Sequence, residues 1–391
     1  MADKKKVIVL FVNPSSGLSG DTQSLVNLIE SLKGKILPIV LLTTKADAFK
    51  LFDSLGIECL VHPYLTVLSP PLGDEIKNVI HHPWRWRIIK WFRYDLPCLL
   101  YVKKALAGRK IDIVHTNTAP TLMGVRIAKM LKVPHVWHIR ENIDPNHTYA
   151  RIVIGRKNLA RVIEKADARI FVSNMCLNFW GVNMQNTWVY LDAVRKKTEC
   201  CYIKEKQPYL LFCSTWISEA KGASKVVSAF GKSGLFAVSS YTKLPIRLKM
   251  VGNCNEDYKK KILTLAESHC CAEYIDFVPV QEDVKPYFAD AMAFIQPSLN
   301  EGLGRTTAEA MFYGCPVIAY ASGGTLDLVK DGETGYLFNT VEECAELMRK
   351  VCTTDQEEVI LRAQEFVKQN LSVENYGEKV MEVYNSVLKT K

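Results

Sequence analysis

The sequence lacks four patterns, and each absence narrows the class of protein. No run of about twenty apolar residues occurs in the 391 residues, so no transmembrane helix is indicated. The charged start is followed by too short an apolar run for a signal peptide, and we interpret residues 7–12 as a first buried strand. Twelve cysteines are scattered without any Cys-x-x-Cys, which predicts a reduced, cytoplasmic protein without a zinc site. Gly-x-Gly-x-x-Gly is also missing, which argues against a nicotinamide dehydrogenase.

Charge is divided unevenly along the chain. Residues 1–200 hold 29 Lys and Arg against 16 Asp and Glu, a net charge of +13, whereas residues 201–391 hold 21 against 25, or −4. A basic first half suggests an anionic partner such as a membrane surface, a phosphate-bearing substrate or nucleic acid. A basic surface that only aids solubility is the plainer alternative. With 48% hydrophobic residues the chain can bury a large core, and its length favours two domains.

The first half alternates apolar strand-like runs with helical stretches, which predicts a parallel, doubly wound sheet. In such sheets ligands bind beyond the carboxyl ends of the strands, where the Gly17-x-x-Gly20 loop and His138 would lie. A plain turn is the alternative explanation of these glycines. The expected strands are residues 7–12, 36–42, 58–62, 111–115, 134–138 and 168–172, and the helices between them include about 21–32, 119–131 and 156–165.

The second half repeats this alternation. The expected strands are residues 209–214, 246–251, 274–278, 291–296, 316–320 and 335–338, and the expected helices are about 223–230, 256–267, 306–313 and 341–351. The charged, turn-prone stretch 195–208 suggests a domain boundary. Two final helices, about 357–369 and 374–388, would pack on the domains or cross back over them.

One stretch of the second half, residues 297–311, combines backbone N–H groups with carboxylates. It follows an expected strand and leads into a helix, so its N–H groups face any ligand in front of the loop. N–H groups suit phosphate or sugar oxygens and carboxylates suit hydroxyls, so the loop indicates a nucleotide-sugar. The stretch contains two glycines and two carboxylates: Gly302, Gly304, Glu301 and Glu309. A capping box that starts at Thr306, together with ordinary turn glycines, is the alternative.

Two further loops of this kind follow expected strands. Lys221-Gly222 opens a helix, so the lysine would meet a diphosphate with a charge-assisted hydrogen bond. Ser322-Gly323-Gly324-Thr325 again offers backbone N–H groups. A solvated lysine would explain the first loop alone, but three such loops on the strand ends of one domain favour a phosphate-bearing ligand.

Residues 81–104 interrupt the alternation with a basic, tryptophan-rich segment. On a helical wheel its aromatic and isoleucine side chains share one face, and most of its basic side chains lie opposite. This pattern is typical of a helix on an anionic membrane surface, where each basic residue contributes about 1 kcal/mol. A helix that packs its aromatic face on the protein's own sheet is the alternative. The residues predicted to contact a membrane or acceptor are Trp84, Arg87, Lys90, Trp91 and Arg93.

Motifs across most of the chain resemble the retaining glycosyltransferases of the GT-B fold, family 4, the group 1 glycosyl transferases. The most specific matches are Pro297-Ser298, Glu301-Gly302-x-Gly304, the glutamate pair Glu301 and Glu309, Ala310-Met311, Gly314-x-Pro316-Val317, Gly323-Gly324 and Asp331-Gly332-x-x-Gly335-Tyr336-Leu337. Looser matches are Lys221-Gly222, Val251-Gly252, Asp112-x-Val114-His115, Val172-Ser173 and Pro134-x-x-x-His138.

The resemblance implies an α/β protein of GT-B architecture, with two Rossmann-like doubly wound parallel-sheet domains that face each other across a cleft. Residues 1–195 would form the acceptor-side domain, and residues 196–372 would form the domain that binds the nucleotide-sugar donor. The helix in residues 373–391 would cross back to the N-terminal domain.

The resemblance also implies roles for individual residues. Glu309 would bind the ribose hydroxyls, and His138 would line the catalytic cleft from the N-terminal domain. Lys221 would neutralise the diphosphate leaving group, where negative charge builds in the transition state. The predicted catalytic residues are Glu301 (on the donor sugar), His138 and Lys221. The predicted donor-binding residues are Gly302, Leu303, Gly304, Arg305, Glu309, Gly222, Gly252 and Val278, with Gly17 and Gly20 facing the phosphates.

No metal or other cofactor is expected. Enzymes that hold the diphosphate through a metal usually need an Asp-x-Asp, which this sequence lacks, so Lys221 and helix dipoles would neutralise it. The sequence departs from the family in two places. Trp216 stands five residues before Lys221, where the family usually has an arginine, so that Arg305 or another basic residue would have to substitute. Leu191-Asp192-Ala193 replaces the usual Asn-Gly/Ala turn.

These inferences lead to a function that the sequence leaves partly open. We expect a cytoplasmic glycosyltransferase, peripheral on the inner face of the cell membrane, that moves a hexose with retention. The donor would be a UDP- or GDP-sugar, and the acceptor a lipid-linked saccharide or another surface glycan. The alternatives are a sugar-nucleotide epimerase of GT-B fold and a non-catalytic nucleotide-sugar- or glycan-binding subunit. A nucleic-acid partner is not expected, because no recognition motif accompanies the basic aromatic stretch.

Overall fold

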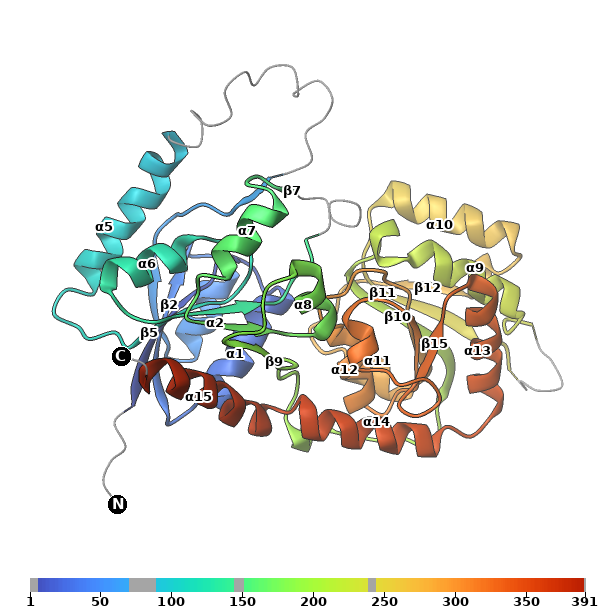
Figure 1. Ribbon diagram of the computed structural model, residues 1–391. Helices are drawn as coiled ribbons and strands as arrows, with labels where there is room; N and C mark the ends of the chain where they lie inside the picture. Colours follow the sequence, from blue (N-terminus) through green and yellow to red (C-terminus); the bar gives the residue numbers. More distant parts are fainter. Residues whose placement is uncertain (1–5, 70–88, 144–150, 238–243, 390–391) are drawn as a thin grey trace. The chain divides into compact units, whose positions relative to one another are not determined.

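The computed structural model describes residues 6–69, 89–143, 151–237 and 244–389 (Figure 1). The chain divides into two compact units, residues 1–193 with 373–391 and residues 194–372. Each unit holds one parallel sheet flanked by helices. The expectation of two doubly wound α/β domains is therefore confirmed.

The sheet of the first unit has seven parallel strands in the order β3-β2-β1-β5-β6-β8-β9. The order reverses between β1 and β5, and ligands bind at such a reversal in open α/β sheets. The strands are β1 (Val7–Val12), β2 (Ile36–Leu42), β3 (Glu58–Val61), β5 (Ile113–Thr116), β6 (His135–Ile139), β8 (Ala168–Phe171) and β9 (Thr187–Val189). A separate antiparallel pair joins β4 (Leu68–Ser69) to β7 (Arg151–Ile152).

Helices cover both faces of this sheet. Successive side chains of a strand point to opposite faces, so Val9 and Phe11 of β1 enter one core and Leu10 and Val12 enter the other. The first core is closed by α1 (Gly20–Ser31), α2 (Asp47–Ser54) and α15 (Val373–Lys389), and the second by α5 (Leu96–Ala105) and α6 (Met123–Leu131). The remaining helices of this unit are α7 (Arg156–Ile163), which connects β7 to β8, and α8 (Asn174–Trp180), which connects β8 to β9.

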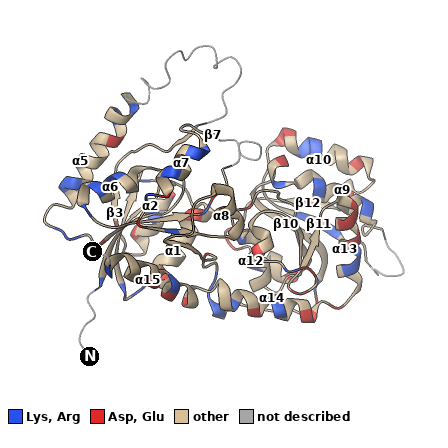
Figure 2. Cartoon of the chain, in the orientation of Figure 1, with Lys and Arg blue, Asp and Glu red and all other residues tan. Residues whose placement is uncertain are grey.

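Residues 89–105 form a helical segment with basic residues at both ends (Figure 2). Its first part, η1 (Trp91–Asp95), is a π-helical turn that leads into α5. Ile89 and Phe92 are 54% and 58% exposed and do not pack on the protein's own sheet, whereas Trp91 is half-buried. Lys90 and Arg93 are exposed beside them. The predicted contact residues Trp84 and Arg87 lie outside the described residues.

The sheet of the second unit has six parallel strands in the order β12-β11-β10-β13-β14-β15, which reverses between β10 and β13. The strands are β10 (Gln207–Trp216), β11 (Arg247–Asn253), β12 (Ile275–Val278), β13 (Ala291–Gln296), β14 (Val317–Tyr320) and β15 (Tyr336–Phe338). Each strand begins and ends within two residues of its predicted position. Their apolar side chains are buried because helices lie on both sides.

Two helices of the second unit begin at side-chain caps. Asn255 accepts a hydrogen bond from the Tyr258 amide (2.7 Å) at the start of α10, and Thr340 accepts one from Glu343 (3.1 Å) at the start of α13. The α-helices are α9 (Ala223–Ser233), α10 (Glu256–Ser268), α11 (Lys285–Asp290), α12 (Arg305–Phe312), α13 (Val341–Thr353) and α14 (Glu357–Asn370). The 3₁₀ turns are η2 (Lys197–Glu199), η3 (Glu219–Lys221), η4 (Ala272–Tyr274) and η5 (Gly323–Asp327).

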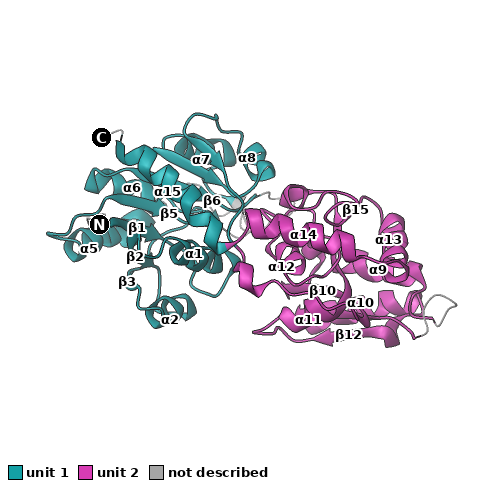
Figure 3. Ribbon diagram, turned by 90° about the horizontal axis from the view of Figure 1, so that it is seen from below, with its two compact units in different colours: residues 1–193, 373–391 teal, residues 194–372 magenta. Residues whose placement is uncertain are grey.

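The C-terminal helix α15 belongs to the first unit although it follows the second in the sequence (Figure 3). Its apolar face, with Tyr376 and Tyr384, lies in the core beside α1. Gly377 allows this close approach, because a Cβ there would lie 2.1 Å from the carbonyl oxygen of Ser31. The first unit is therefore built from two segments that are separated by the whole second unit.

Three further observations concern the described residues. None of their helices is both long enough and apolar enough to cross a lipid bilayer. No group of three or more His, Cys, Asp or Glu side chains among them is arranged to hold a metal ion. All twelve cysteines are free thiols. Burial raises the pKa of Cys315 to about 12, so this thiol stays protonated and unreactive at neutral pH.

Candidate functional site

The two loops that flank the strand-order reversal of the second unit carry an ion pair. Lys221 ends η3 after β10, and Glu301 lies on the loop after β13. The Lys221 Nζ is 2.7 Å from the Glu301 Oε1. Both side chains keep exposed surface, 42% for the lysine and 16% for the carboxylate. The structure thus brings together the residues that the sequence predicted for the diphosphate and the donor sugar, at the point of the sheet where ligands bind.

Glycines pack the neighbouring loops directly against one another. A Cβ at Gly222 would lie 2.8 Å from the carbonyl oxygen of Pro297, and one at Gly324 would lie 2.1 Å from that of Gly302. The Gly324 N–H donates to the carbonyl of Glu301 (2.7 Å). This N–H is therefore engaged within the protein, and the prediction that the Ser322–Thr325 loop offers it to a ligand is wrong. These glycines fix the position of the Glu301 loop.

Helix α12 starts at Gly304, whose φ of 89° is one that residues with a side chain rarely adopt. Thr306 is therefore inside the helix, and the capping-box alternative is wrong. No side chain caps the helix start, so the first N–H groups of α12 remain directed at the loop's surroundings. The hydroxyls of Thr307 and Thr325 are buried without a partner among the described residues, and each lies 3.4 Å from where a Gly304 Cβ would be.

The predicted ribose ligand, Glu309, is held by an arginine that the sequence did not single out. The Arg195 Nη2 is 3.0 Å from the Glu309 Oε1, and the Arg195 Nε donates to the Tyr313 hydroxyl (2.5 Å). Burial, with a smaller contribution from the charge of Glu309, raises the pKa of the Cys213 thiol in β10 to about 12. Arg195 holds the Glu309 carboxylate in position, and the carboxylate keeps 12% exposed surface.

Trp216 occupies an exposed position at the carboxyl end of β10. Its side chain is 59% exposed, and its strand pairs there with Asn253 of β11. The structure therefore presents an indole at the strand end where a cation was expected from the resemblance.

The other predicted donor-binding residues of this unit differ in what they contribute. Gly252 has a structural role, since a Cβ there would lie 1.9 Å from the carbonyl oxygen of Ser214. Leu303 is buried in the packed loop, and Val278 and Arg305 are half-buried, the first at the end of β12 and the second at the start of α12.

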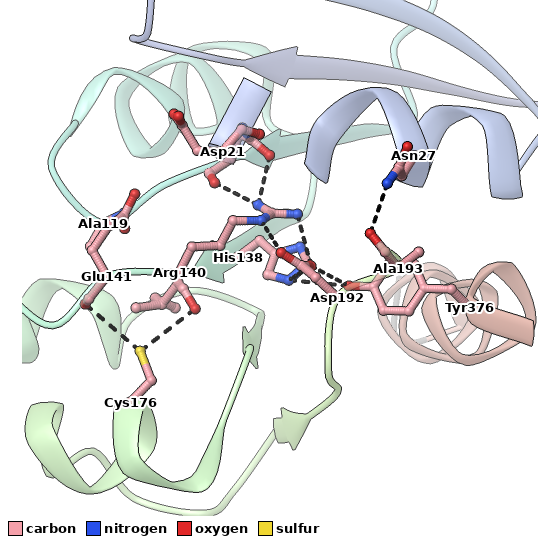
Figure 4. Close-up of polar contacts among 12 residues, drawn as sticks. Asp21, Asn27, Ala119, His138, Arg140, Glu141, Cys176, Asp192, Ala193 and Tyr376 are labelled. Carbon is pink, nitrogen blue, oxygen red and sulfur yellow. Dashed lines mark hydrogen bonds and ion pairs between the residues drawn. The ribbon is translucent and has the colours of Figure 1, made fainter. Parts of the chain in front are cut away.

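In the first unit, polar side chains meet where the strand order reverses. Asn13 follows β1, Asn117 follows β5, and the Asn117 Nδ2 donates to the Asn13 Oδ1 (2.9 Å). Arg140, just after β6, donates from Nη1 to the Asn117 Oδ1 (2.6 Å). Its Nε donates to the Asp192 Oδ2 (2.7 Å; Figure 4). All four residues are buried. They form a buried hydrogen-bond network at the carboxyl ends of the strands, the edge at which ligands bind in such sheets.

His138 contacts Asp192 of this buried network. The prediction that His138 lines a ligand-binding surface is wrong for this structure. It has no exposed surface, because α15 covers it. Its Nε2 lies 3.2 Å from both the Asp192 Oδ1 and the Tyr376 hydroxyl. Burial lowers the pKa of His138 to about 4, so the imidazole is neutral at physiological pH. Burial alone would raise the pKa of Asp192, but Arg140 and His138 hold it well below its usual range.

Two carboxylates lie near this buried network, at the same edge of the sheet. The Glu141 Oε2 accepts a hydrogen bond from the Ala119 amide (3.0 Å), and burial together with the charge of Asp21 raises the pKa of Glu141 to about 7. Asp21, in the first turn of α1, accepts hydrogen bonds from the hydroxyls of Ser15 and Ser19. This edge therefore favours hydroxyl groups over anions.

The carboxylate of Asp21 also changes the interpretation of the Gly17–Gly20 loop. Neither glycine has a positive φ, and a side chain at Gly17 would meet open space. Position 17 therefore does not need glycine for a close backbone approach. A negative charge at its end repels phosphate, so the structure gives no support to the prediction that this loop faces the donor phosphates.

Sequence reasoning missed Arg140, Glu141, Arg195 and Tyr376. A signal existed for the first two, because charged residues directly after an apolar strand mark the ligand-binding edge of a parallel sheet. Arg195 and Tyr376 carry no local signal. Their partners come from elements far away in the sequence, such as Asp192 for Tyr376.

Two family models match the chain, Glycosyltransferase Family 4 over residues 52–180 and Glycosyl transferases group 1 over residues 201–369. An uncharacterized glycosyltransferase of Haemophilus influenzae is 31% identical over 145 residues, which are 36% of this chain and 39% of that protein. The sulfoquinovosyl transferase of Arabidopsis thaliana is 37% identical over 321 residues, which are 71% of this chain and 60% of that protein. The chain thus spans less than two thirds of the length of these curated relatives.

Solved structures of the same fold cover nearly the whole chain. Anabaena HepE, solved in complex with UDP and glucose, superposes with a TM-score of 0.74 at 18% identity, over 97% of this chain and 100% of that one. A glycosyltransferase from Rickettsia africae superposes with a TM-score of 0.75 at 17% identity, over 99% and 100%. At such identities the likeness establishes the fold alone. With both family models matched in order along two parallel-sheet domains, the chain belongs to the GT-B glycosyltransferases of family 4.

Proposed function

We propose that the protein is a retaining, metal-independent glycosyltransferase that moves a hexose from a UDP- or GDP-sugar to a lipid-linked saccharide or another surface-glycan acceptor. The observation that carries this proposal is the Lys221–Glu301 pair, 2.7 Å apart where the strand order of the second unit reverses. A cation and a carboxylate side by side match a ligand in which a diphosphate adjoins a polyhydroxylated ring. Anabaena HepE, which shares the fold, was solved with UDP-glucose.

The proposed division of work follows from the charges. The bond between the anomeric carbon and the diphosphate oxygen breaks, so negative charge grows on the diphosphate. Lys221 and the uncapped start of α12 would stabilise it, which removes the need for a metal ion. Glu301 would accept hydrogen bonds from the sugar hydroxyls and Glu309 from the ribose. Glu141 and Asp21, in the other unit, would bind the acceptor hydroxyl.

Titration calorimetry with UDP, GDP, ADP and their sugar conjugates tests the donor site. Lys221→Ala should weaken binding of the preferred diphosphate about tenfold to a hundredfold, because a charge-assisted hydrogen bond is worth about 1.5–3 kcal/mol. Lys225→Ala is the matched control, since this lysine is on α9 and its Nζ lies over the ring of Tyr320 (4.5 Å). Glu309→Ala should also weaken binding. If none of the nucleotides binds the wild-type protein, the proposal is wrong.

We also propose that residues 89–105 attach the protein to an anionic membrane surface from the cytoplasmic side. Ile89, Phe92 and Leu100 are each more than half exposed, and they recur along one helical segment. Lys90 and Arg93 are exposed within it, where they would pair with lipid phosphates. Such a position would hold the first unit near a lipid-linked acceptor.

Co-sedimentation with anionic liposomes tests this attachment. The double charge reversal Lys90→Glu/Arg93→Glu should lower the bound fraction strongly. Lys260→Glu/Lys330→Glu, which reverses two exposed lysines of the second unit, should lower it much less. Equal losses in both variants would mean that net charge alone governs binding and would contradict a specific surface.

Trp216 favours a second candidate, a nucleotide-sugar-binding subunit without transferase activity. The indole stands where the family usually has an arginine, so the diphosphate would leave with one cation fewer to stabilise it. Product analysis with and without saccharide acceptors separates the candidates. Donor binding without transfer to any acceptor favours the binding subunit, and conversion of the nucleotide-sugar without an acceptor indicates an epimerase.

A further inference from the structure

A surface cavity lies between α7 and α8 of the first unit, outside the sites described above. Its volume is about 400 Å³. One wall is formed by α7 and the other by the end of α8 with Phe179 and Trp180. Arg156, Lys157 and Arg161 of α7 line it, and all three are exposed. The cavity is therefore a basic pocket with aromatic walls.

The positive charge of this pocket is not neutralised by the described part of the chain. No described carboxylate forms an ion pair with Arg156, Lys157 or Arg161. Glu164 is the one acidic residue that lines the pocket, and its Oε1 already accepts hydrogen bonds from the Asn183 amide (3.2 Å) and Nδ2 (3.3 Å). The pocket thus carries three cations against one carboxylate that is engaged elsewhere.

These cations are badly placed for the stability of α7 itself. Arg156 and Lys157 are its first two residues, where the helix dipole disfavours positive charge. Lys157 and Arg161 are four residues apart, a spacing at which like charges repel. Arg156 is held in position over the ring of Phe179, 5.0 Å from its centroid. Cations that weaken their own helix and line a cavity are better explained by an anionic ligand than by helix formation.

The pocket adjoins the edge of the sheet at which the acceptor hydroxyl would bind. The Trp180 Nε1 donates to the carbonyl oxygen of Glu141 (2.9 Å), and the Cys176 Sγ contacts the same oxygen (3.7 Å; Figure 4). The indole that walls the pocket is therefore bonded to the residue whose carboxylate lies at that edge. A ligand with a hydroxyl at Glu141 and an anionic group nearby would extend into the pocket.

We propose that this pocket binds a phosphate group carried by the acceptor. The inference rests on the proposed transferase function and adds to it the chemical class of the acceptor: a phosphorylated saccharide or a lipid phosphate. Guanidinium groups bind phosphate through two parallel hydrogen bonds, and a dianionic phosphate together with the Glu164 carboxylate balances the three cations. The phosphate would orient the acceptor so that its hydroxyl lies at Glu141.

Binding of glycerol 3-phosphate, measured by calorimetry with UDP present to occupy the donor site, tests the pocket. Arg156→Ala/Arg161→Ala should weaken binding about tenfold or more, because two charge-assisted hydrogen-bonding groups are removed. Lys165→Ala is the matched control, since this exposed lysine lies just beyond α7 and does not line the cavity. The proposal is overturned if the double variant and Lys165→Ala have equal effects, or if neither has an effect, both in this assay and in the vesicle assay described next.

Vesicles of phosphatidylcholine with and without phosphatidic acid distinguish the two sources of the phosphate. A loss of phosphatidic-acid-dependent binding in the double variant but not in Lys165→Ala supports a lipid phosphate. A loss confined to glycerol 3-phosphate supports a soluble phosphorylated acceptor. If neither ligand distinguishes the double variant from the control, the pocket does not bind phosphate.

The failure of this proposal can be told apart from the failure of the proposed function. UDP binding reports the second unit alone and should be the same in the wild-type protein, the double variant and the control. Absence of binding of both UDP and GDP in all three contradicts the transferase function itself. Normal UDP binding with phosphate binding that does not depend on Arg156 and Arg161 contradicts only the pocket. Unchanged thermal unfolding of the double variant shows that the cavity still forms.

Discussion

Arg140 is the residue on which the polar interior of the first unit depends. Its guanidinium is buried between Asn117 and Asp192, and His138 and Tyr376 bind the same aspartate. A buried cation is tolerated only with a charged, hydrogen-bonded partner. The negative charge of Asp192 is therefore needed for folding rather than for contact with a ligand.

Asp192→Asn tests this dependence. The neutral amide keeps the shape of the side chain but leaves Arg140 without a counter-charge, so the free energy of unfolding of the first unit should fall by about 3–5 kcal/mol. Thermal unfolding followed by circular dichroism measures the loss, with Asp53→Asn, a change at an exposed residue, as control. A loss below about 1 kcal/mol would mean that Asn117 alone satisfies the guanidinium.

Glu141 should make stability depend on pH near neutrality. Its pKa is raised from 4.5 to about 7, so the folded protein binds this proton more tightly than the unfolded chain does. This carboxyl alone should lower the free energy of unfolding by about 1–3 kcal/mol as the pH rises from about 4.5 to 7, whereas the buried His135 and His138, whose pKa values are lowered to about 3 and about 4, raise it over the same range. Denaturant titrations at several pH values isolate the contribution of Glu141 as a difference: Glu141→Gln should gain stability relative to the wild-type protein as the pH rises, and Glu267→Gln should not. An unchanged pH profile in Glu141→Gln would contradict the assignment.

Trp216 allows a test of how the diphosphate charge is balanced. Trp216→Arg places a second cation five residues before Lys221, at the same strand end, and should tighten UDP binding about tenfold. Trp216→Phe, which keeps an aromatic ring without the charge, is the control and should not tighten it. Calorimetry decides between them. Weaker binding in the arginine variant would indicate that the indole itself contacts the ligand.

The accuracy of prediction from the sequence differed between local and distant contacts. Lys221 and Glu301 were recognisable because each follows an apolar strand and precedes a helix, and such strand ends meet at one edge of a sheet. The burial of His138 was not recognisable, because Tyr376, which covers it, lies 238 residues away. Pairs of this kind depend on how the complete domain packs.

At the scale of elements, the loops after β13 and β14 are packed and hydrogen-bonded to each other. A Cβ at Gly324 would approach the Gly302 carbonyl to 2.1 Å, and the Gly324 N–H is bonded to Glu301. Any movement of η5 therefore moves the carboxylate that is proposed to bind the donor sugar.

Gly324→Ala should separate these two loops. The added methyl group forces the Glu301–Gly302 backbone away, so we expect a loss of about 1–3 kcal/mol in stability and a weaker affinity for UDP-sugars than for UDP. Calorimetry with both ligands measures the difference. Gly17→Ala, where an added Cβ meets open space and φ is not positive, is the control. Equal effects of the two variants would show that loop contact is unimportant.

The ends of elements were predicted well for strands that are buried on both faces of their sheet. The six strands of the second sheet lie within two residues of their predicted positions, because continuous apolar runs identify strands covered on both faces. The short elements α8, of seven residues, and β9, of three, were missed. Neither is long enough to show the recurrence of apolar residues that identifies a helix or a strand. The π-helical turn η1 likewise shifts the helical wheel that was drawn through residues 81–104.

At the scale of the molecule, the second unit is continuous and the first is not. Residues 194–372 contain a complete sheet and core, so this fragment should fold alone and bind the preferred nucleotide about as well as the full chain. Residues 1–193 should not fold cooperatively alone, because Val380, Val383 and Tyr384 of α15 fill their core. Circular dichroism and calorimetry on both fragments check this, and cooperative unfolding of residues 1–193 would contradict it.

The return of α15 to the first unit sets an order of events during synthesis. After residue 193 leaves the ribosome, the 179 residues from 194 to 372 are made before the closing helix exists. At 5–20 residues per second this takes roughly 10 to 40 s, during which the core under α1 and α2 lacks the side chains of α15. The second domain can therefore complete its fold before the first, reversing the usual N-to-C order. The nascent N-terminal half is the part of this chain that would need a chaperone.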